Sequence, residues 1–161
     1  MTIATTIDAI QADVRAVSSI TKAPKHNDYP GSLNTADMPI AITWPADGDM
    51  WHKGTGYNIH KGVYEVAVYV KPVEQGGGIY EGWDQTIDVM QAVLDALSDK
   101  DNNSLSTGTY QAYVTPSADT PLVHGGLEVI AYPPQATGVE GYPHYFGFRV
   151  RVPVNEQWSQ T

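Results

Sequence analysis

The side chains that most often carry out chemistry are scattered along this sequence. The five histidines all fall in or beside segments predicted as loops: His26, His52, His60, His124 and His144. His52 and His60 flank one long loop and could meet across it, but two ligands fall short of the tetrahedral set of a zinc site. No two histidines have the HxH or HExxH spacing of a metalloenzyme. We therefore predict neither a metal site nor a bound cofactor.

Nucleophiles and phosphate-binding loops are equally hard to find. The chain has no cysteine, and no serine has the GxSxG setting of a hydrolase nucleophile. Gly76, Gly77 and Gly78 precede a predicted helix, where backbone N–H groups can hold phosphate. However, Glu81 and Asp84 follow, and no lysine stands beside the glycines. A flexible strand-to-helix link explains them better, and we predict that the protein is not an enzyme.

Charge and composition argue against further classes. The 161 residues include 18 Asp plus Glu against 9 Lys plus Arg, a formal charge of -9 at pH 7. Proteins that grip nucleic-acid phosphates are usually basic, so specific DNA binding is not expected, although DNA could slide past such a surface. The sequence shows neither a membrane-spanning run nor a signal peptide. We expect one domain, residues 1–161, that does not bind a membrane.

Two amphipathic helices are predicted, at residues 5–20 and 80–98. The second has the stronger signal, and five apolar residues at helical spacing are expected to pack on a sheet: Trp83, Ile87, Met90, Leu94 and Leu97. Its acidic residues Asp84, Asp88 and Asp95 fall on other faces of the helix. Helices that cover one face of a sheet make an α+β layer.

Alternating apolar residues predict the strands of that sheet. Strands are expected at residues 38–45, 63–70, 109–115, 127–132 and 145–154. The last strand has an almost unbroken apolar face, and Arg149 and Arg151 lie side by side on its other face. The predicted fold class is α+β: a mainly antiparallel sheet with two helices packed on one face and a long β-hairpin-like arm.

The arm is the glycine-rich insertion at residues 46–62, ADGDMWHKGTGYNIHKG. It carries Trp51, Tyr57 and Ile59, and exposed apolar groups of this kind usually mark an interaction site. We therefore predict an arm that is poorly ordered in an isolated subunit and ordered against a partner. A long loop is expected at residues 133–144 and a flexible tail at residues 155–161.

Residues 29–42, YPGSLNTADMPIAI, resemble the stretch YPPxSLxxADLPA that is common after the first helix in tail-terminator and neck proteins of long-tailed bacteriophages. Gly31 and Met38 depart from that motif, whereas the order of the elements is similar over most of the chain. The resemblance implies a virion protein that forms a ring, typically a hexamer, on the last ring of the tail-tube protein. Such a ring stops tail growth, meets the head connector or stopper protein, and lets DNA pass without specific binding.

A ring subunit needs two different contact surfaces. The residues predicted for subunit or tail-tube contacts are Trp51, Tyr57, Ile59, Tyr69, Arg149 and Arg151. A partly apolar second sheet face is expected to take part: Val63, Ala67, Tyr69, Ile130 and Tyr132. Asp84, Asp88 and Asp95 are candidates for the channel wall, with a plain solvated helix face as the alternative.

Two other functions stay open from the sequence. A head-completion stopper, or another neck connector, is the nearest structural alternative. A β-rich carbohydrate- or peptide-binding module, using Trp51, Tyr57 and Tyr142, is the alternative of a different class. A monomer stabilised by its ligand would favour the binding module, whereas a ring would favour the structural role.

Overall fold

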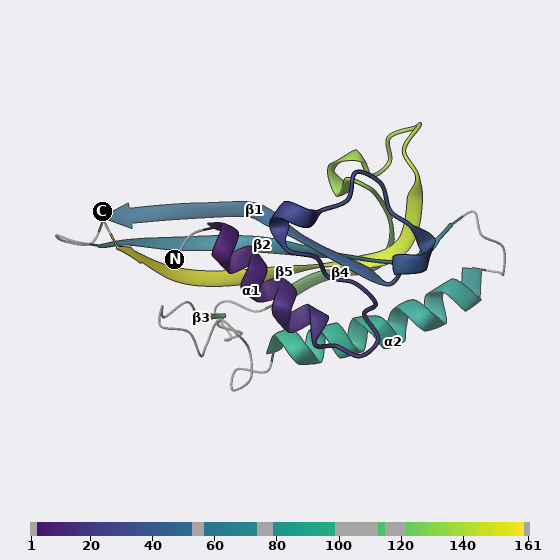
Figure 1. Ribbon diagram of the computed structural model, residues 1–161, viewed down its shortest axis with the longest axis horizontal. Coiled ribbons are helices and arrows are strands. Elements are labelled where there is room, and N and C mark those ends of the chain that lie inside the picture. The colour runs from purple at the N-terminus through teal and green to yellow at the C-terminus, as the bar shows by residue number, and fades with distance from the viewer. Residues whose placement is uncertain (1–2, 53–56, 74–78, 99–112, 115–121, 160–161) are drawn as a thin grey trace.

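The computed structural model shows a five-stranded antiparallel sheet with both helices on one face (Figure 1). The structure describes residues 3–52, 57–73, 79–98, 113–114 and 122–159. The helices and strands are α1 (Ile3–Arg15), β1 (Ile40–His52), β2 (Tyr57–Pro72), α2 (Ile79–Ser98), β3 (Tyr113–Val114), β4 (Val123–Ala131) and β5 (His144–Ser159). This arrangement confirms the predicted α+β class. Of the strand expected at residues 109–115, only β3 lies in the described part.

The strands β2 and β5 form the centre of the sheet. They pair in one long antiparallel register that runs from Pro72 opposite Tyr145 to Tyr57 opposite Ser159. β1 lies on the outer side of β2, while β4 and β3 follow one another along the far edge of β5. The pairing with β2 corrects the expected flexible tail, because residues 155–159 are part of β5. Residues 160–161 lie outside the described part.

One face of the sheet packs on the helices. Alternate residues of β2 and β5 supply its buried apolar side chains, as the sequence predicts: Tyr64, Val66, Val68, Val70, Phe148, Val150, Val152 and Val154. From α1, Ile7, Ile10 and Val14 pack on this face. The core therefore lies between the two central strands and the helix layer.

The helix α1 is shorter than expected and ends at Arg15. The next residues tighten into turns, in which the Val17 N–H donates to the Val14 carbonyl oxygen at 3.1 Å. Ser18 and Ser19 follow, and serine side chains compete with helical backbone bonds. Val17 and Ile20 still reach the core, so the apolar spacing remains useful beyond the helix end.

The helix α2 is rotated relative to the prediction. Met90 and Leu97 are buried as predicted, and Val89 and Val93 complete the buried side, whereas Ile87 is 51% exposed and Leu94 only partly buried. A close approach explains the rotation, because a Cβ atom at Gly82 would lie 2.8 Å from the Phe146 ring. Trp83 packs on the same ring, with the two ring centroids 5.1 Å apart, so the start of α2 meets the sheet through both Gly82 and Trp83.

This rotation gives a matched pair of expected results on α2. Val93→Ala should lower the free energy of unfolding by about 2 kcal/mol, because it removes methyl groups from a fully buried site. Ile87→Ala should change it by less than about 0.5 kcal/mol, because half of that side chain faces solvent. Urea unfolding of both variants measures the difference, and equal losses would contradict the rotation.

The other face of the sheet has a second, smaller core. Ile40, Ile42, Ala67, Tyr69, Ile130 and Tyr145 are buried there. Leu33 and Met38, from the segment before β1, pack against them. The Tyr132 hydroxyl donates to the Pro30 carbonyl oxygen and ties that segment to the end of β4. The chain thus covers, with its own residues, the half of this face that contains the start of β1 and the start of β5.

Candidate interaction surfaces

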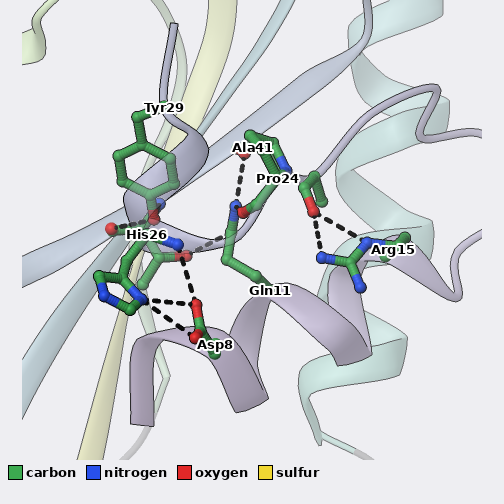
Figure 2. A network of polar contacts seen from close by, with 9 residues as sticks. Asp8, Gln11, Arg15, Pro24, His26, Tyr29 and Ala41 are labelled. Atoms are coloured by element: carbon green, nitrogen blue, oxygen red, sulfur yellow. Dashed lines mark hydrogen bonds and ion pairs between the residues drawn. The ribbon is translucent and has the colours of Figure 1, made fainter. Parts of the chain in front are cut away.

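A buried polar network fixes α1 to the start of β1 (Figure 2). The Gln11 side chain is fully buried, and its amide nitrogen donates to the Pro24 and Ala41 carbonyl oxygens at 2.7 and 2.9 Å. Its amide oxygen accepts a hydrogen bond from the Thr43 hydroxyl at 2.8 Å. Arg15 donates to the Ala23 carbonyl oxygen from Nε at 2.9 Å. Helix, loop and strand are therefore held as one unit.

The same region closes the outer edge of β1 over its first four residues. The Ala41 N–H donates to the Lys22 carbonyl oxygen at 3.0 Å. The Tyr29 hydroxyl accepts from the Thr43 N–H and donates to the Thr43 carbonyl oxygen. Burial raises the pKa of Tyr29 to about 12, so this hydroxyl keeps its proton at neutral pH. An open strand edge invites pairing with another chain, and this half of the edge is protected.

An ion pair on the solvent side of this network gives a pH-dependent expectation. Burial alone would raise the pKa of Asp8, but the hydrogen bonds from His26 and the charges of His26 and Lys25 lower it overall. A lowered pKa in the folded state means stability that is present above the unfolded value, about 3.9, and lost as pH falls through the folded value. Asp8→Asn should therefore differ most from the parent above about pH 4.

Chemical unfolding of both proteins at a series of pH values between about 3 and 6 tests this expectation. The two free energies of unfolding should converge toward the acid end of that range. A difference that stays constant with pH would show that Asp8 acts through its shape and not through its charge.

Beyond this closed edge, β1, β2 and β5 continue as a three-stranded arm. Figure 1 shows that the end of β1, the start of β2 and the end of β5 extend together past both helices. Gly48 lies opposite Gly62, and Met50 lies opposite His60. The predicted insertion at residues 46–62 is thus largely regular strand instead of a poorly ordered loop. Residues 53–56 lie outside the described part.

The β1 strand of the arm is exposed on both of its faces over residues 45–50. All residues of β1 from 45 to 50 are exposed, and Met50 has 45% of its surface open to solvent. A ribbon of strands normally needs a covered apolar face for stability. The structure describes the backbone of Trp51, Tyr57 and Ile59 but not their side chains, so their predicted role in a contact stays a prediction.

A groove lies on the uncovered half of the second sheet face. It consists of two adjacent hollows of about 220 and 320 Å³ that share Glu65 and Arg149. Trp44, Pro134 and Gln135 line the first hollow, while Val123, Glu128 and Arg151 line the second. We call this surface the Arg149 groove.

Arg149 at the centre of this groove is held by two carboxylates. Its Nε and Nη2 atoms donate to the two oxygens of Glu128 at 2.7 and 3.0 Å. Its Nη1 atom lies 3.9 Å from a Glu65 oxygen. The hydrogen bonds with Glu128 raise the pKa of Arg149 above its usual value. Arg151 differs, because its side chain is exposed and makes no hydrogen bond or ion pair within the part of the chain that the structure describes.

The structure contradicts one predicted contact residue and agrees with the placement of two others. Tyr69 is fully buried, and its hydroxyl donates to the Ala131 carbonyl oxygen at 2.8 Å, so it is wrong as a contact residue. Its place on an apolar face is correct, but the chain itself covers that face. Arg149 and Arg151 do lie on one exposed surface. Sequence reasoning missed Trp44, Glu65 and Glu128 there.

Two further groups were singled out from the sequence. Asp84, Asp88 and Asp95 all lie exposed on the outer side of α2, so the channel-wall hypothesis stays a prediction. Tyr142 is 47% exposed in the loop that precedes β5, at the end of the sheet opposite the arm. The structure therefore does not bring Tyr142 together with Trp51 and Tyr57, and the binding module predicted from these three residues lacks a common site.

Comparisons with known proteins add no family to this description. Neither the family models nor the curated proteins with which the sequence was compared gave a match. Within the described residues, no group of three or more His, Cys, Asp or Glu side chains could hold a metal ion. No helix in that part of the chain is both long and apolar enough to cross a membrane.

Proposed function

We propose that this chain is a structural subunit of a homo-oligomeric ring, and that the ring is a tail terminator of a long-tailed bacteriophage. In this proposal the ring, typically a hexamer, is part of the virion and sits between the tail tube and the head connector or stopper protein. It ends tail growth and lets DNA pass. The subunit carries out no catalysis and needs no cofactor.

The arm is the observation that carries the proposal. Three strands project beyond the helices, and residues 45–50 of β1 are exposed without exception. Such a ribbon contributes little to the core of its own subunit, and exposed surface of this kind suits contact with a neighbouring subunit. An arm on one subunit and an acceptor elsewhere on the next give a heterologous contact, the kind from which rings are built when the rotation between subunits closes.

The segment that resembles the terminator motif protects the edge of β1 and packs on the second core. Tyr29 closes the edge of β1, Asn34 accepts a hydrogen bond from the Ala36 N–H, and Leu33 and Met38 pack on the second core. The residues that carry the resemblance are therefore part of the folded core and of the edge of β1, which agrees with the proposal.

The exposed acidic side of α2 supports the same proposal. Asp84, Asp88 and Asp95 are exposed and have no lysine or arginine among their neighbours on that helix. A channel wall that carries negative charge repels DNA phosphates and so avoids holding them. In the proposed ring this side of α2 faces the lumen.

Polymerisation of the tail-tube protein encoded with this chain tests the proposed function. With the purified chain present, electron micrographs should show a ring at one end of each tube and tubes that stop growing. Binding to the head connector without any effect on the tubes would instead identify a head-completion stopper. Tubes of unchanged length with no bound chain would contradict the terminator role.

A further inference from the structure

We propose that the Arg149 groove receives the arm of a second copy of this chain, with Arg151 at the rim of the groove contacting Asp49 of the arm. This inference rests on the proposed ring and names the acceptor surface of its subunit contact. It assigns a partner to a charged surface that the chain itself leaves open.

The groove offers an unengaged positive charge beside apolar surface. The Arg149 charge is already matched by Glu128 and Glu65, whereas Arg151 has no partner in the described part of the chain. Val123, beside Arg151, is 51% exposed. An arginine next to exposed apolar groups is a common centre of protein contacts.

The arm offers the complementary charge. The side chain of Asp49 is exposed and has no hydrogen bond or ion pair in the described residues, whereas that of the neighbouring Asp47 accepts from the Gly48 N–H at 2.8 Å. The exposed Met50 follows Asp49 directly and lies on the opposite face of the strand. The charge of Asp49 on the arm thus matches the charge that Arg151 offers in the groove.

The two charges cannot meet within one subunit. Arg151 lies opposite Glu65, and Asp49 lies opposite Lys61, four residues further along β2. Asp49 is on β1 and Arg151 is on β5, two strands apart, so their Cα atoms are about 16 Å apart. Residues 45–52 span about 23 Å, which is long enough to reach a neighbour. A contact between different surfaces of successive copies is heterologous, and it forms a ring when the rotation between copies closes.

The net charge opposes self-association, and a contact between opposite charges offsets part of that repulsion. At a formal charge of -9, two copies repel one another. Of the three arginines, Arg15 is bound to a carbonyl oxygen and Arg149 to carboxylates. Arg151 therefore remains as an arginine that can attract an acidic neighbour, and it lies on the open face.

Charge reversal tests the pairing of Arg151 with Asp49. Arg151→Glu and Asp49→Arg should each weaken association by about tenfold or more, and the double variant should recover most of the loss. Lys25→Glu and Asp28→Arg make the same charge changes on an exposed loop away from the groove, and they should leave association unchanged. Single variants that associate as the parent does would contradict the contact.

Disulfide trapping gives the closing test, because the chain has no cysteine of its own. A chain with Asp49→Cys is mixed with a chain with Arg151→Cys under mild oxidation. The mixture should give a cross-linked pair of 17.5 kDa chains several-fold faster than Asp28→Cys mixed with Arg151→Cys. An equal rate for the two mixtures would overturn the arm-in-groove contact.

The mass of the parent by light scattering separates this inference from the proposed function. An oligomer that shows no preferential cross-link would overturn the groove as acceptor and leave the ring standing. A monomer without the cross-link would overturn both.

Discussion

Gly147→Ala should be among the most destabilising single substitutions in this protein, with a loss of at least about 3 kcal/mol in the free energy of unfolding. Gly147 lies in β5 opposite Tyr69, at the centre of the sheet. A Cβ atom at this position would lie 2.0 Å from the Val68 carbonyl oxygen and 3.1 Å from its carbonyl carbon. The obstacle is backbone, so no side-chain rotation relieves it.

The substitution acts next to an irregularity in the pairing of the two central strands. The register between β2 and β5 shifts between Tyr69 and Lys71, next to the Gly147 pair. Adding a methyl group must push the two central strands apart and disturb both cores, because helices pack on one side and Tyr69 on the other.

Gly125→Ala is the matched control for this prediction. A Cβ atom there would have nothing within 4 Å, so the variant should unfold within about 0.5 kcal/mol of the parent. Urea denaturation of both variants gives the comparison. A Gly147→Ala protein as stable as the Gly125→Ala protein would mean that β2 and β5 are spaced more widely than described.

Removing the arm should abolish assembly and spare the fold. In the shortened chain, a two-residue Asn-Gly turn replaces residues 49–61, so that it joins Gly48 to Gly62, and the chain ends after Asn155. The facing pair of Gly48 and Gly62 suits such a turn. Of the removed residues whose side chains the structure describes, Asp49, Met50 and Lys61 are exposed and none is buried, so the core of the remaining chain is kept, whereas the proposed subunit contact disappears.

Circular dichroism and light scattering on the shortened chain test both parts of this expectation. The melting temperature should stay within a few degrees of the parent, while association weakens by about a hundredfold or more. Tyr142→Ala, which removes an exposed aromatic ring at the opposite end of the sheet, should change neither quantity. If the shortened chain unfolds, the arm is part of the folding core. If it assembles normally, the arm makes no contact that assembly needs.

The strand faces could be predicted because burial on a strand repeats every second residue. Val66, Val68, Val150 and Val152 therefore fall on the helix face, as the alternation indicates. The rotation of α2 could not be predicted in the same way. Its sequence contains two apolar stripes, and the close approach at Gly82 to the Phe146 ring selects between them. Such a contact depends on a residue distant in the sequence.

On the interaction surfaces too, some features follow from the local sequence and others depend on the pairing of the whole sheet. Arg149 and Arg151 on one face of a strand follow from local alternation, and the structure confirms that placement. Glu65 and Glu128 come from two other strands, so their meeting with Arg149 depends on the register of the whole sheet. The glycines of the arm favour a loop locally, and its pairing with the end of β5 overrides that preference.

The mass of the purified parent chain tests the central claim most directly. Size-exclusion chromatography with light scattering, over a wide range of protein concentration and at low and high salt, should show a closed oligomer of 17.5 kDa subunits, typically six. Negative-stain images of the same fractions should show rings with a central opening. A monomer under all of these conditions, with no ring in the images, would contradict the account.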